Sequence, residues 1–338
     1  MRGIDYLARR SAFGVLAILA LGIAGCTSHT PLVEPPVAEP AVVTVTPDVV
    51  EAPLPEPEPA VAIAAPPRLP PVAIVISNNQ PAYLDVAVEL ASYFEDHALY
   101  DLSDESLPPV TVLRSINDTD ATVVIAIGLR AAQSSVAMSE VPVVFSQVFN
   151  HQDHKLLANN SRGVAAIAPL AAQLDAWKKI DPAVARVGLI IGAGHDELLA
   201  DAELAAQQHN IDLEVRIAHS DQETLYLFRR MIRDIDGFWL FPDNRILSAR
   251  VLNQMLADAN RQRVPVVAPT EAMLQMGAAI SMSTVAADIA AKIATVVRRI
   301  QAGEIDLLPA MTALSEVRVA VNDKAPTRQT VANVSESP

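Results

Sequence analysis

Two short stretches of the sequence combine residue types that could bind a phosphate group or a metal ion. Gly192, Ala193 and Gly194 lie between a predicted strand and a predicted helix, which is the place of a phosphate-binding turn. A dinucleotide-binding turn needs a third glycine three residues further on, where this chain has Glu197. Because an acid at that position would repel a phosphate, we interpret the stretch as a tight strand-to-helix turn.

The other stretch, residues 151–154, reads His-Gln-Asp-His and contains ligand types that zinc accepts. It follows a predicted strand and no second histidine cluster accompanies it, so we favour a solvated loop and expect no metal site. The sequence also lacks the G-x-S-x-G elbow, the H-E-x-x-H pair and the Walker loop. We therefore predict a protein that is not an enzyme and that carries no cofactor.

The single cysteine, Cys26, follows a segment typical of a secretory signal. Arginines near the start precede an uncharged stretch over residues 11–22, which is too short to span a bilayer and fits the apolar region of a signal peptide. Residues 23–26, Ile-Ala-Gly-Cys, resemble the bacterial lipobox, in which the cysteine thiol receives diacylglycerol before cleavage. We expect residues 1–25 to be removed and Cys26 to become the lipid-anchored N-terminus of a lipoprotein.

The residues after Cys26 predict where the anchor lies and how the chain leaves the membrane. Thr27, instead of aspartate, indicates the outer membrane of a Gram-negative bacterium, with the protein facing the periplasm. Residues 31–71 hold 13 of the 25 prolines and no glycine, a composition that favours an extended, semi-rigid spacer. We assign residues 26–71 to the lipidated N-terminus and a disordered Pro-rich stalk, which is either a tether or a variable linker.

The rest of the chain has the composition of a folded α/β protein. Hydrophobic residues make up 51% of the chain, enough for a core, and the formal net charge of -14 argues against nucleic-acid binding. From residue 72 onward strand-like and helix-like segments alternate, which is typical of parallel sheets with crossover helices. Strands are predicted at residues 72–77, 110–113, 121–127, 142–145, 186–191, 213–217, 237–241, 265–267, 278–281 and 316–321. Helices are predicted at residues 81–97, 131–138, 169–180, 196–209, 221–233, 247–261, 270–276 and 284–301.

This alternation predicts two lobes. We expect an N-terminal lobe over residues 72–145, completed by about residues 282–321, a C-terminal lobe over residues 146–281, and a disordered tail over residues 322–338. Ligands of open α/β sheets bind at the carboxyl ends of the strands. The candidate ligand-binding residues at those ends are Ser77, Asn78, Arg130, Ser146, Gln147, Asp243, Asn244, Thr270 and Glu271.

Two kinds of role are open for these candidates. The Arg130 guanidinium could clamp a carboxylate, and Asp243 or Glu271 could hold an amine. Each candidate could instead only cap a helix, because Ser, Asp, Asn and Thr are common before helices for that reason alone.

Several stretches resemble one family in their order and spacing. They are residues 141–148 (Val-Pro-Val-Val-Phe-Ser-Gln-Val), 173–174 (Gln-Leu), 179–182 (Lys-Ile-Asp-Pro), 186–189 (Arg-Val-Gly-Leu), 241–244 (Phe-Pro-Asp-Asn), 264–267 (Val-Pro-Val-Val), 270–271 (Thr-Glu) and 277–278 (Gly-Ala). They are similar to the periplasmic substrate-binding proteins of ABC transporters, in the branch that includes aromatic amino-acid binders. The resemblance implies the two-lobed type I periplasmic binding fold, in which each lobe is a parallel sheet with flanking helices.

The resemblance also implies a function. It implies transport: a small solute, amino-acid-like in this branch, is captured in the cleft between the lobes and delivered to an ABC permease. The alternative is a repurposed envelope lipoprotein that acts as a protein-interaction or sensing module without transport. Thr27, the stalk and the Gly128-Leu-Arg turn, where the family usually has small residues, favour this alternative.

Overall fold

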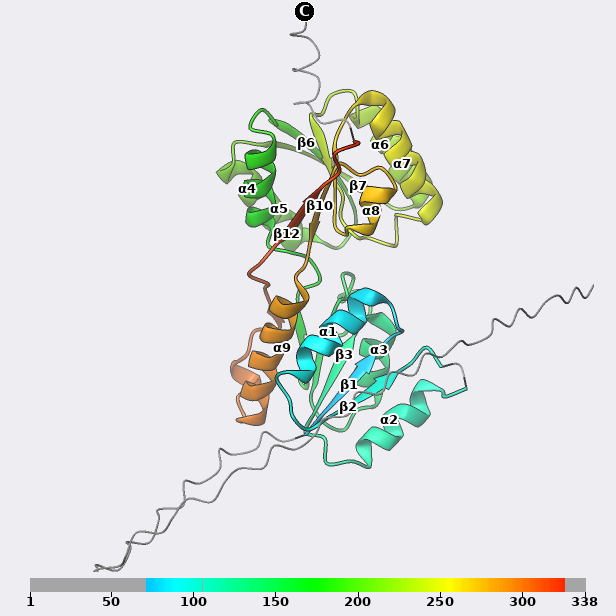
Figure 1. Cartoon of the computed structure of the whole chain (residues 1–338), viewed down its shortest axis with the longest axis vertical. Helices are drawn as coiled ribbons and strands as arrows, with labels where there is room; N and C mark the ends of the chain where they lie inside the picture. Colours follow the sequence, from blue (N-terminus) through cyan, green and yellow to red (C-terminus); the bar gives the residue numbers. More distant parts are fainter. Residues whose placement is uncertain (1–70, 105, 326–338) are drawn as a thin grey trace, which may run out of the picture. The chain divides into compact units, whose positions relative to one another are not determined.

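The computed structural model describes residues 71–104 and 106–325 (Figure 1). The predicted signal peptide, Cys26, all of the stalk except residue 71, and most of the expected tail lie outside the described residues, so what we expect of them stays a prediction. Among the described residues, we find no helix with the length and apolarity that a bilayer span requires.

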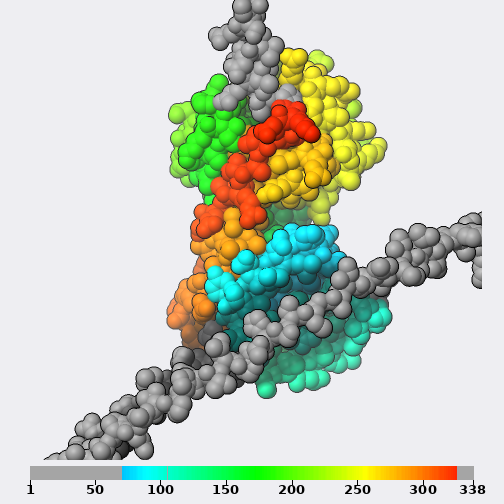
Figure 2. All heavy atoms as spheres, in the orientation of Figure 1, coloured from blue at the N-terminus to red at the C-terminus, as the bar shows by residue number. Residues whose placement is uncertain are grey.

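The first lobe is built on a sheet of six parallel strands in the order β11-β5-β4-β3-β1-β2. Every residue of β1 and β3 is buried, because helices cover both faces of the sheet. One face packs on α1 and α9, which lie side by side (Figures 1 and 2), and the other face packs on α2 and α3. The strands are β1 (Val72–Ile76), β2 (His97–Asp101), β3 (Val123–Ile127), β4 (Val143–Ser146), β5 (Ser161–Val164) and β11 (Met311–Thr312); the helices are α1 (Pro81–Ala91), α2 (Pro109–Asn117), α3 (Leu129–Met138), α9 (Ala286–Gln301) and the short η1 (Ile305–Leu307).

The second lobe has a sheet in the order β12-β10-β9-β8-β6-β7, parallel except for the antiparallel pair of β10 and β12. Helices α4 and α5 pack with one hydrophobic cluster of this lobe, and α6 and α7 pack with another. The strands are β6 (Arg186–Gly192), β7 (Asp212–Ala218), β8 (Gly237–Trp239), β9 (Val266–Ala268), β10 (Ile280–Ser283) and β12 (Arg318–Val321); the helices are α4 (Leu170–Ile180), α5 (Asp196–Gln208), α6 (Asp221–Met231), α7 (Ala249–Gln262) and α8 (Ala272–Gln275).

The chain passes between the two lobes three times. The passages are those from β5 to α4, from β10 to α9 and from β11 to β12. The expected α/β class with two mainly parallel sheets is therefore confirmed. The division of the chain differs from the expected one: the first sheet continues past residue 145 to Val164, and β12 lies in the second sheet although we had placed residues 282–321 in the first lobe.

Several elements differ from the sequence-based prediction, which had also placed nothing at η1 or β11. The predicted strand at residues 110–113 is wrong, because this segment belongs to α2. Pro109 stands in the first turn of that helix, and Val112, Leu113 and Ile116 form its buried face. Strands β2 and β5 were not predicted. β2 is an edge strand whose first three residues are exposed, so its hydrophobic pattern is weak.

Candidate functional site

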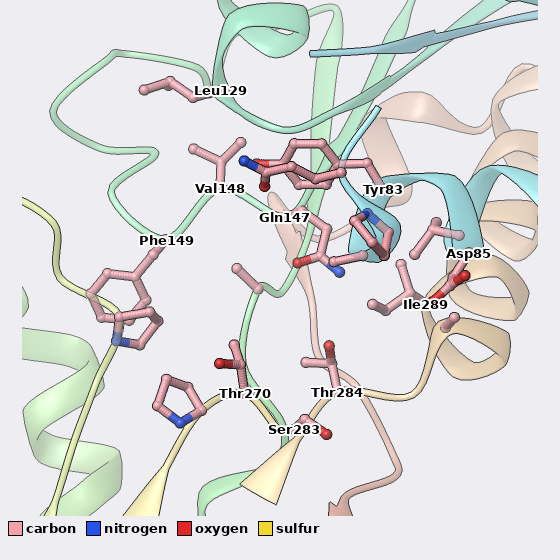
Figure 3. A pocket seen from close by; sticks show the side chains of 18 of the residues that line it. Tyr83, Asp85, Leu129, Gln147, Val148, Phe149, Thr270, Ser283, Thr284 and Ile289 are labelled. Carbon is pink, nitrogen blue, oxygen red and sulfur yellow. The ribbon is translucent and has the colours of Figure 1, made fainter. Parts of the chain in front are cut away.

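A cavity of about 710 Å³ lies where the carboxyl ends of strands from both sheets come together (Figure 3). The first lobe contributes the start of α1 and the segment after β4, and the second lobe contributes the segments after β8, β9 and β10. Its volume is within the ~300–1,000 Å³ that small-molecule sites occupy. A cavity lined by both lobes and open on one side is suited to admit a small solute from the surrounding water.

Aromatic and aliphatic side chains form part of the cavity wall (Figure 3). Tyr83 comes from the first turn of α1, Phe149 from the segment after β4, Leu129 from α3 and Ile289 from α9. Burial raises the pKa of the Tyr83 phenol, so its hydroxyl stays protonated at neutral pH and can donate a hydrogen bond to a solute.

The sequence before α1 explains why Tyr83 reaches the cavity. Asn78 Oδ1 accepts a hydrogen bond from the Gln80 amide at 3.0 Å, which turns the chain after β1. Pro81 then begins the helix, at a position where its missing N–H costs nothing. The first turn of α1, with Tyr83, is thereby placed at the carboxyl end of the sheet.

Charged groups of both signs line the cavity. Asp85 lies on α1, Glu271 follows β9, and Arg318 begins β12 in register with Ser283 of β10, which also lines the cavity. All three charged side chains are exposed, and none of them forms an ion pair within the described part of the chain. Their charges are therefore available to a solute that carries both an amine and a carboxylate.

The backbone is unusual at Gln147, directly after β4. Its φ of 61° lies in the left-handed region, which a residue with a side chain adopts only at a cost of ~1–3 kcal/mol. Gln147 is one of four predicted residues that the structure brings together in the cavity wall, and the others are Asn244, Thr270 and Glu271. Strain of this kind gathers at binding sites, where the surrounding structure holds it.

The other five predicted residues do not line this cavity. Ser77 Oγ accepts a hydrogen bond from the Ala131 amide at 2.9 Å and so satisfies the start of α3, which is the helix-cap alternative. Asn78 makes the turn before α1, Arg130 is exposed on α3, and Ser146 is completely buried.

Asp243 is the fifth of these residues, and it makes an internal ion pair. Arg245 donates from Nε to Asp243 Oδ1 at 2.9 Å and from Nη2 to Oδ2 at 2.8 Å, and the Gly192 amide donates to Oδ2 at 2.9 Å. Desolvation by burial would raise the pKa of the Asp243 carboxyl, but hydrogen bonds from Arg245, His195 and the Gly192 amide outweigh it and hold the pKa well below its usual range. Asp243 is therefore an ionised structural group.

The two stretches that first suggested chemistry are turns. Residues 192–194 connect β6 to α5, as expected, and Asp243 accepts the Gly192 amide that a phosphate would otherwise need. Residues 151–154 lie in a turn after β4, where desolvation lowers the pKa of His151 and His154 Nδ1 lies 3.0 Å from Gln133 Nε2. Within the described ranges, no group of three or more His, Cys, Asp or Glu side chains could hold a metal ion.

Sequence reasoning missed several residues of the cavity wall. Tyr83 and Asp85 lie on the helix predicted at residues 81–97, on which we had named no candidate ligand-binding residue. A Pro soon after a strand end was the signal that could have pointed to this helix start. Arg318 and Phe149 had no such signal, because the first depends on an antiparallel return strand and the second on a segment without regular structure.

Comparisons with known proteins agree with this architecture. A sequence model of the family described as ABC transporter substrate binding protein matches residues 99–336. Among curated protein sequences, none matches this chain.

Solved structures share the fold at low sequence identity. A conserved domain protein from Vibrio cholerae is 18% identical with a TM-score of 0.53, over 78% of this chain and 97% of that one. An ABC domain in complex with L-Trp from Streptococcus pneumonia is 16% identical with a TM-score of 0.53, over 78% of this chain and 98% of that one. A substrate binding protein with adhesive properties from Clostridium difficile, in its ligand-free, open structure, is 14% identical with a TM-score of 0.57, over 80% of this chain and 96% of that one.

Proposed function

This chain belongs to the ABC transporter substrate binding protein family, and from that premise we propose that it captures a small, amino-acid-like solute in the cavity between its lobes. Its two-lobed fold matches that of type I periplasmic binding proteins, as the sequence predicted. Membership in a family named for binding a substrate supports a solute-binding role and is consistent with a protein that is not an enzyme.

The observation that carries the proposal is the pairing of apolar walls with unpaired charges of both signs. Arg318 can hold a carboxylate by a charge-assisted hydrogen bond, while Asp85 or Glu271 can hold an ammonium group. The Tyr83 and Phe149 rings offer apolar surface to a side chain. A free amino acid combines these three features in one molecule.

A binding screen tests this proposal. The purified full chain is heated with amino acids, nucleosides, sugars and small peptides in turn. A solute at a hundredfold excess over its Kd stabilises the folded state by ~2.7 kcal/mol. We expect a shift of the unfolding temperature with amino-acid-like solutes, and the proposal fails if a broad library of them gives no shift.

Variants of the site make the screen specific. Arg318→Gln removes the cation that would bind the carboxylate, and a lost charge-assisted bond costs ~1.5–3 kcal/mol of affinity. At the same solute concentration the stabilisation should fall from ~2.7 to ~0.3–1.3 kcal/mol. Arg233→Gln is the matched control: Arg233 is also exposed and also lacks an ion pair in the described part of the chain, but it does not line the cavity. An equal loss in both variants would mean that the shift does not come from this cavity.

We also propose that the protein works as a lipid-anchored receptor facing the periplasm, with an ABC permease as the recipient of the solute. The lipobox-like residues 23–26 support the anchor, and the family match supports the permease as recipient. Thr27 favours the outer membrane and, with the Pro-rich residues 31–71, favours the alternative of an envelope lipoprotein that acts without transport. Metabolic labelling with a fatty acid tests the anchor: label should enter the wild-type chain and not Cys26→Ala. Label in both, or in neither, would contradict the anchor at Cys26.

A further inference from the structure

The segment between β4 and β5, residues 147–160, is an unusual connection that we call the connecting loop. β4 and β5 are parallel neighbours, and such strands are usually joined by a crossover helix. Here only turns and irregular backbone join them. The connecting loop therefore lacks the packed helical face that orders most crossovers, and it needs other anchors.

Those anchors lie in the opposite lobe. Asn150 of the connecting loop donates from Nδ2 to Asp243 Oδ1 at 3.2 Å and to Asn244 Oδ1 at 2.9 Å, and both acceptors follow β8 of the second sheet. Asn150 Oδ1 lies 3.0 Å from Nε2 of His195, which follows β6. Asn150 and Asp243 are 5% and 1% exposed, so these bonds are shielded from water.

Neighbouring contacts extend the same attachment. Arg245, which pairs with Asp243, also donates from Nη1 to Asp153 Oδ2 of the connecting loop at 2.8 Å. The centroid of the Phe149 ring lies 4.8 Å from that of His195 and 6.3 Å from that of Phe241, and Phe149 packs against a hydrophobic cluster of the second lobe. Polar and apolar contacts thus both join the connecting loop to the lobe that does not contain its flanking strands.

The attached part of the connecting loop is also a wall of the cavity. Residues 147–150 and His154 line it, and Figure 3 labels Gln147, Val148 and Phe149 among them. Gln147 holds its left-handed backbone there. A segment of irregular backbone keeps such a strained conformation only when its surroundings hold it. The central acceptor of these contacts is the Asp243 carboxylate, which is ionised and fully buried.

We propose that Asp243 is a positioning residue that fastens the connecting loop to the second lobe and so presets one wall of the cavity before a solute arrives. Besides the three covalent passages, this side-chain attachment is a fourth link between the lobes. It lowers the ordering cost of binding, since residues 147–150 need not find their places when the solute enters. The inference that the preset wall helps to bind a solute rests on the proposed function. The inference that Asp243 holds the connecting loop on the second lobe does not depend on it.

Hydrogen–deuterium exchange of the full chain without solute tests the attachment. The amides of Lys155 and Leu156 donate to carbonyls within the connecting loop, so peptides over residues 148–156 report its opening. In Asp243→Asn, which removes the charge but keeps the shape, we expect exchange of these peptides to accelerate roughly tenfold or more. Exchange in α6 and α7 should stay unchanged.

Substitutions on the loop side separate positioning from general support. Asn150→Asp places two carboxylates face to face and should also accelerate exchange of the connecting loop. Combining Asn150→Asp with Asp243→Asn restores an amide–carboxylate pair, and exchange should be slower than in either single variant. A role of Asp243 in general stability alone would give no such recovery.

The matched control is Asp258→Asn in α7. Asp258 is also a buried aspartate of the second lobe, paired with Arg229 and Arg261, but it does not touch the connecting loop. It should leave exchange at residues 148–156 unchanged. The inference is overturned if the connecting loop exchanges at the wild-type rate in Asp243→Asn and Asn150→Asp, or if α6 and α7 accelerate as much as the loop. Failure of the proposed function would look different: no solute would stabilise the chain although the connecting loop is protected.

Discussion

Replacing Gly128 by alanine should destabilise the protein by an amount that the structure allows us to work out. Gly128 precedes α3 with a φ of +86°, and an added Cβ would lie 2.7 Å from both Ser77 Oγ and Tyr83 Cζ. With a ψ of 169°, this backbone lies in a region that is essentially restricted to glycine, so alanine costs ~1–3 kcal/mol there, and the stiffer unfolded chain returns ~0.4–1 kcal/mol. Crowding adds ~1–3 kcal/mol, because neither the helix-capping hydroxyl nor the ring can withdraw freely. These contributions add to a net loss of about 1–6 kcal/mol, centred near 3 kcal/mol.

Gly303→Ala is the matched control for Gly128→Ala. Gly303 also has a positive φ, +80°, but an added Cβ would meet nothing within 4 Å. Gly303→Ala should therefore show the backbone cost alone, a net loss of about 0–1.6 kcal/mol.

Urea unfolding of the full chain measures both variants, and thermal unfolding should show a difference of roughly 2–4 °C for each kcal/mol. Equal losses of stability in Gly128→Ala and Gly303→Ala would refute the argument that an added Cβ at Gly128 crowds Ser77 and Tyr83. Losses count as equal when they differ by less than about 0.5 kcal/mol, which is the scatter expected for independent sites. A larger loss in Gly128→Ala would support the argument. Because Tyr83 lines the cavity, the same variant should also weaken any solute binding found in the screen.

Three further predictions concern buried polar groups. The pKa of the Asp243 carboxyl is lowered in the folded state. The stabilisation that Asp243 provides is therefore present above the unfolded pKa of ~3.9 and is lost as the pH falls toward the folded pKa. In urea unfolding, the stability advantage of wild type over Asp243→Asn should be constant from about pH 7 to 5 and should shrink below about pH 4. The pKa of the Tyr83 phenol is raised in the folded state, so its contribution to stability is complete below about pH 10 and is lost as the pH rises through the folded pKa. Tyr83→Phe should remove this loss of stability at alkaline pH. In an ultraviolet titration, the same variant should lack one phenol that titrates late. Gln173 accepts from Trp239 Nε1 at 2.9 Å and donates to the Ala168 carbonyl at 2.8 Å, so Gln173→Leu should cost ~1–3 kcal/mol in urea unfolding, and a loss under about 0.5 kcal/mol would contradict this account.

The sequence predicted those elements whose local pattern and tertiary role agree. β1 and β3 are continuous apolar runs, and both are buried central strands, so the local pattern was sufficient. The segment Val110–Leu113 is rich in β-branched residues, but the proline before it and the spacing to Ile116 favour a helix. β2 and β5 are held by their neighbours in the sheet more than by apolar residues of their own, and no pattern of period two marked them.

The site was predictable only in part, for a geometric reason. The rule that ligands bind at the carboxyl ends of strands found Gln147, Asn244, Thr270 and Glu271, because these residues lie in the segments that follow β4, β8 and β9. The same rule also selected Ser77 and Asp243, whose side chains are used by internal hydrogen bonds. A sequence cannot distinguish the two outcomes, since partners such as Ala131 for Ser77 and Gly192 for Asp243 become neighbours only in the folded chain.

The threefold passage of the chain between the lobes has a consequence for synthesis on the ribosome. Helix α9 covers a face of β1 and β3, yet it is made more than 150 residues after them, as their positions in the chain show. The last strand of each sheet, β11 and β12, comes later still. A nascent chain that ends before residue 286 therefore exposes apolar strand surface that its missing segment would cover. Neither lobe can be completed early, so folding waits for the C-terminal part, and a polypeptide in this state remains open to chaperones and to translocation.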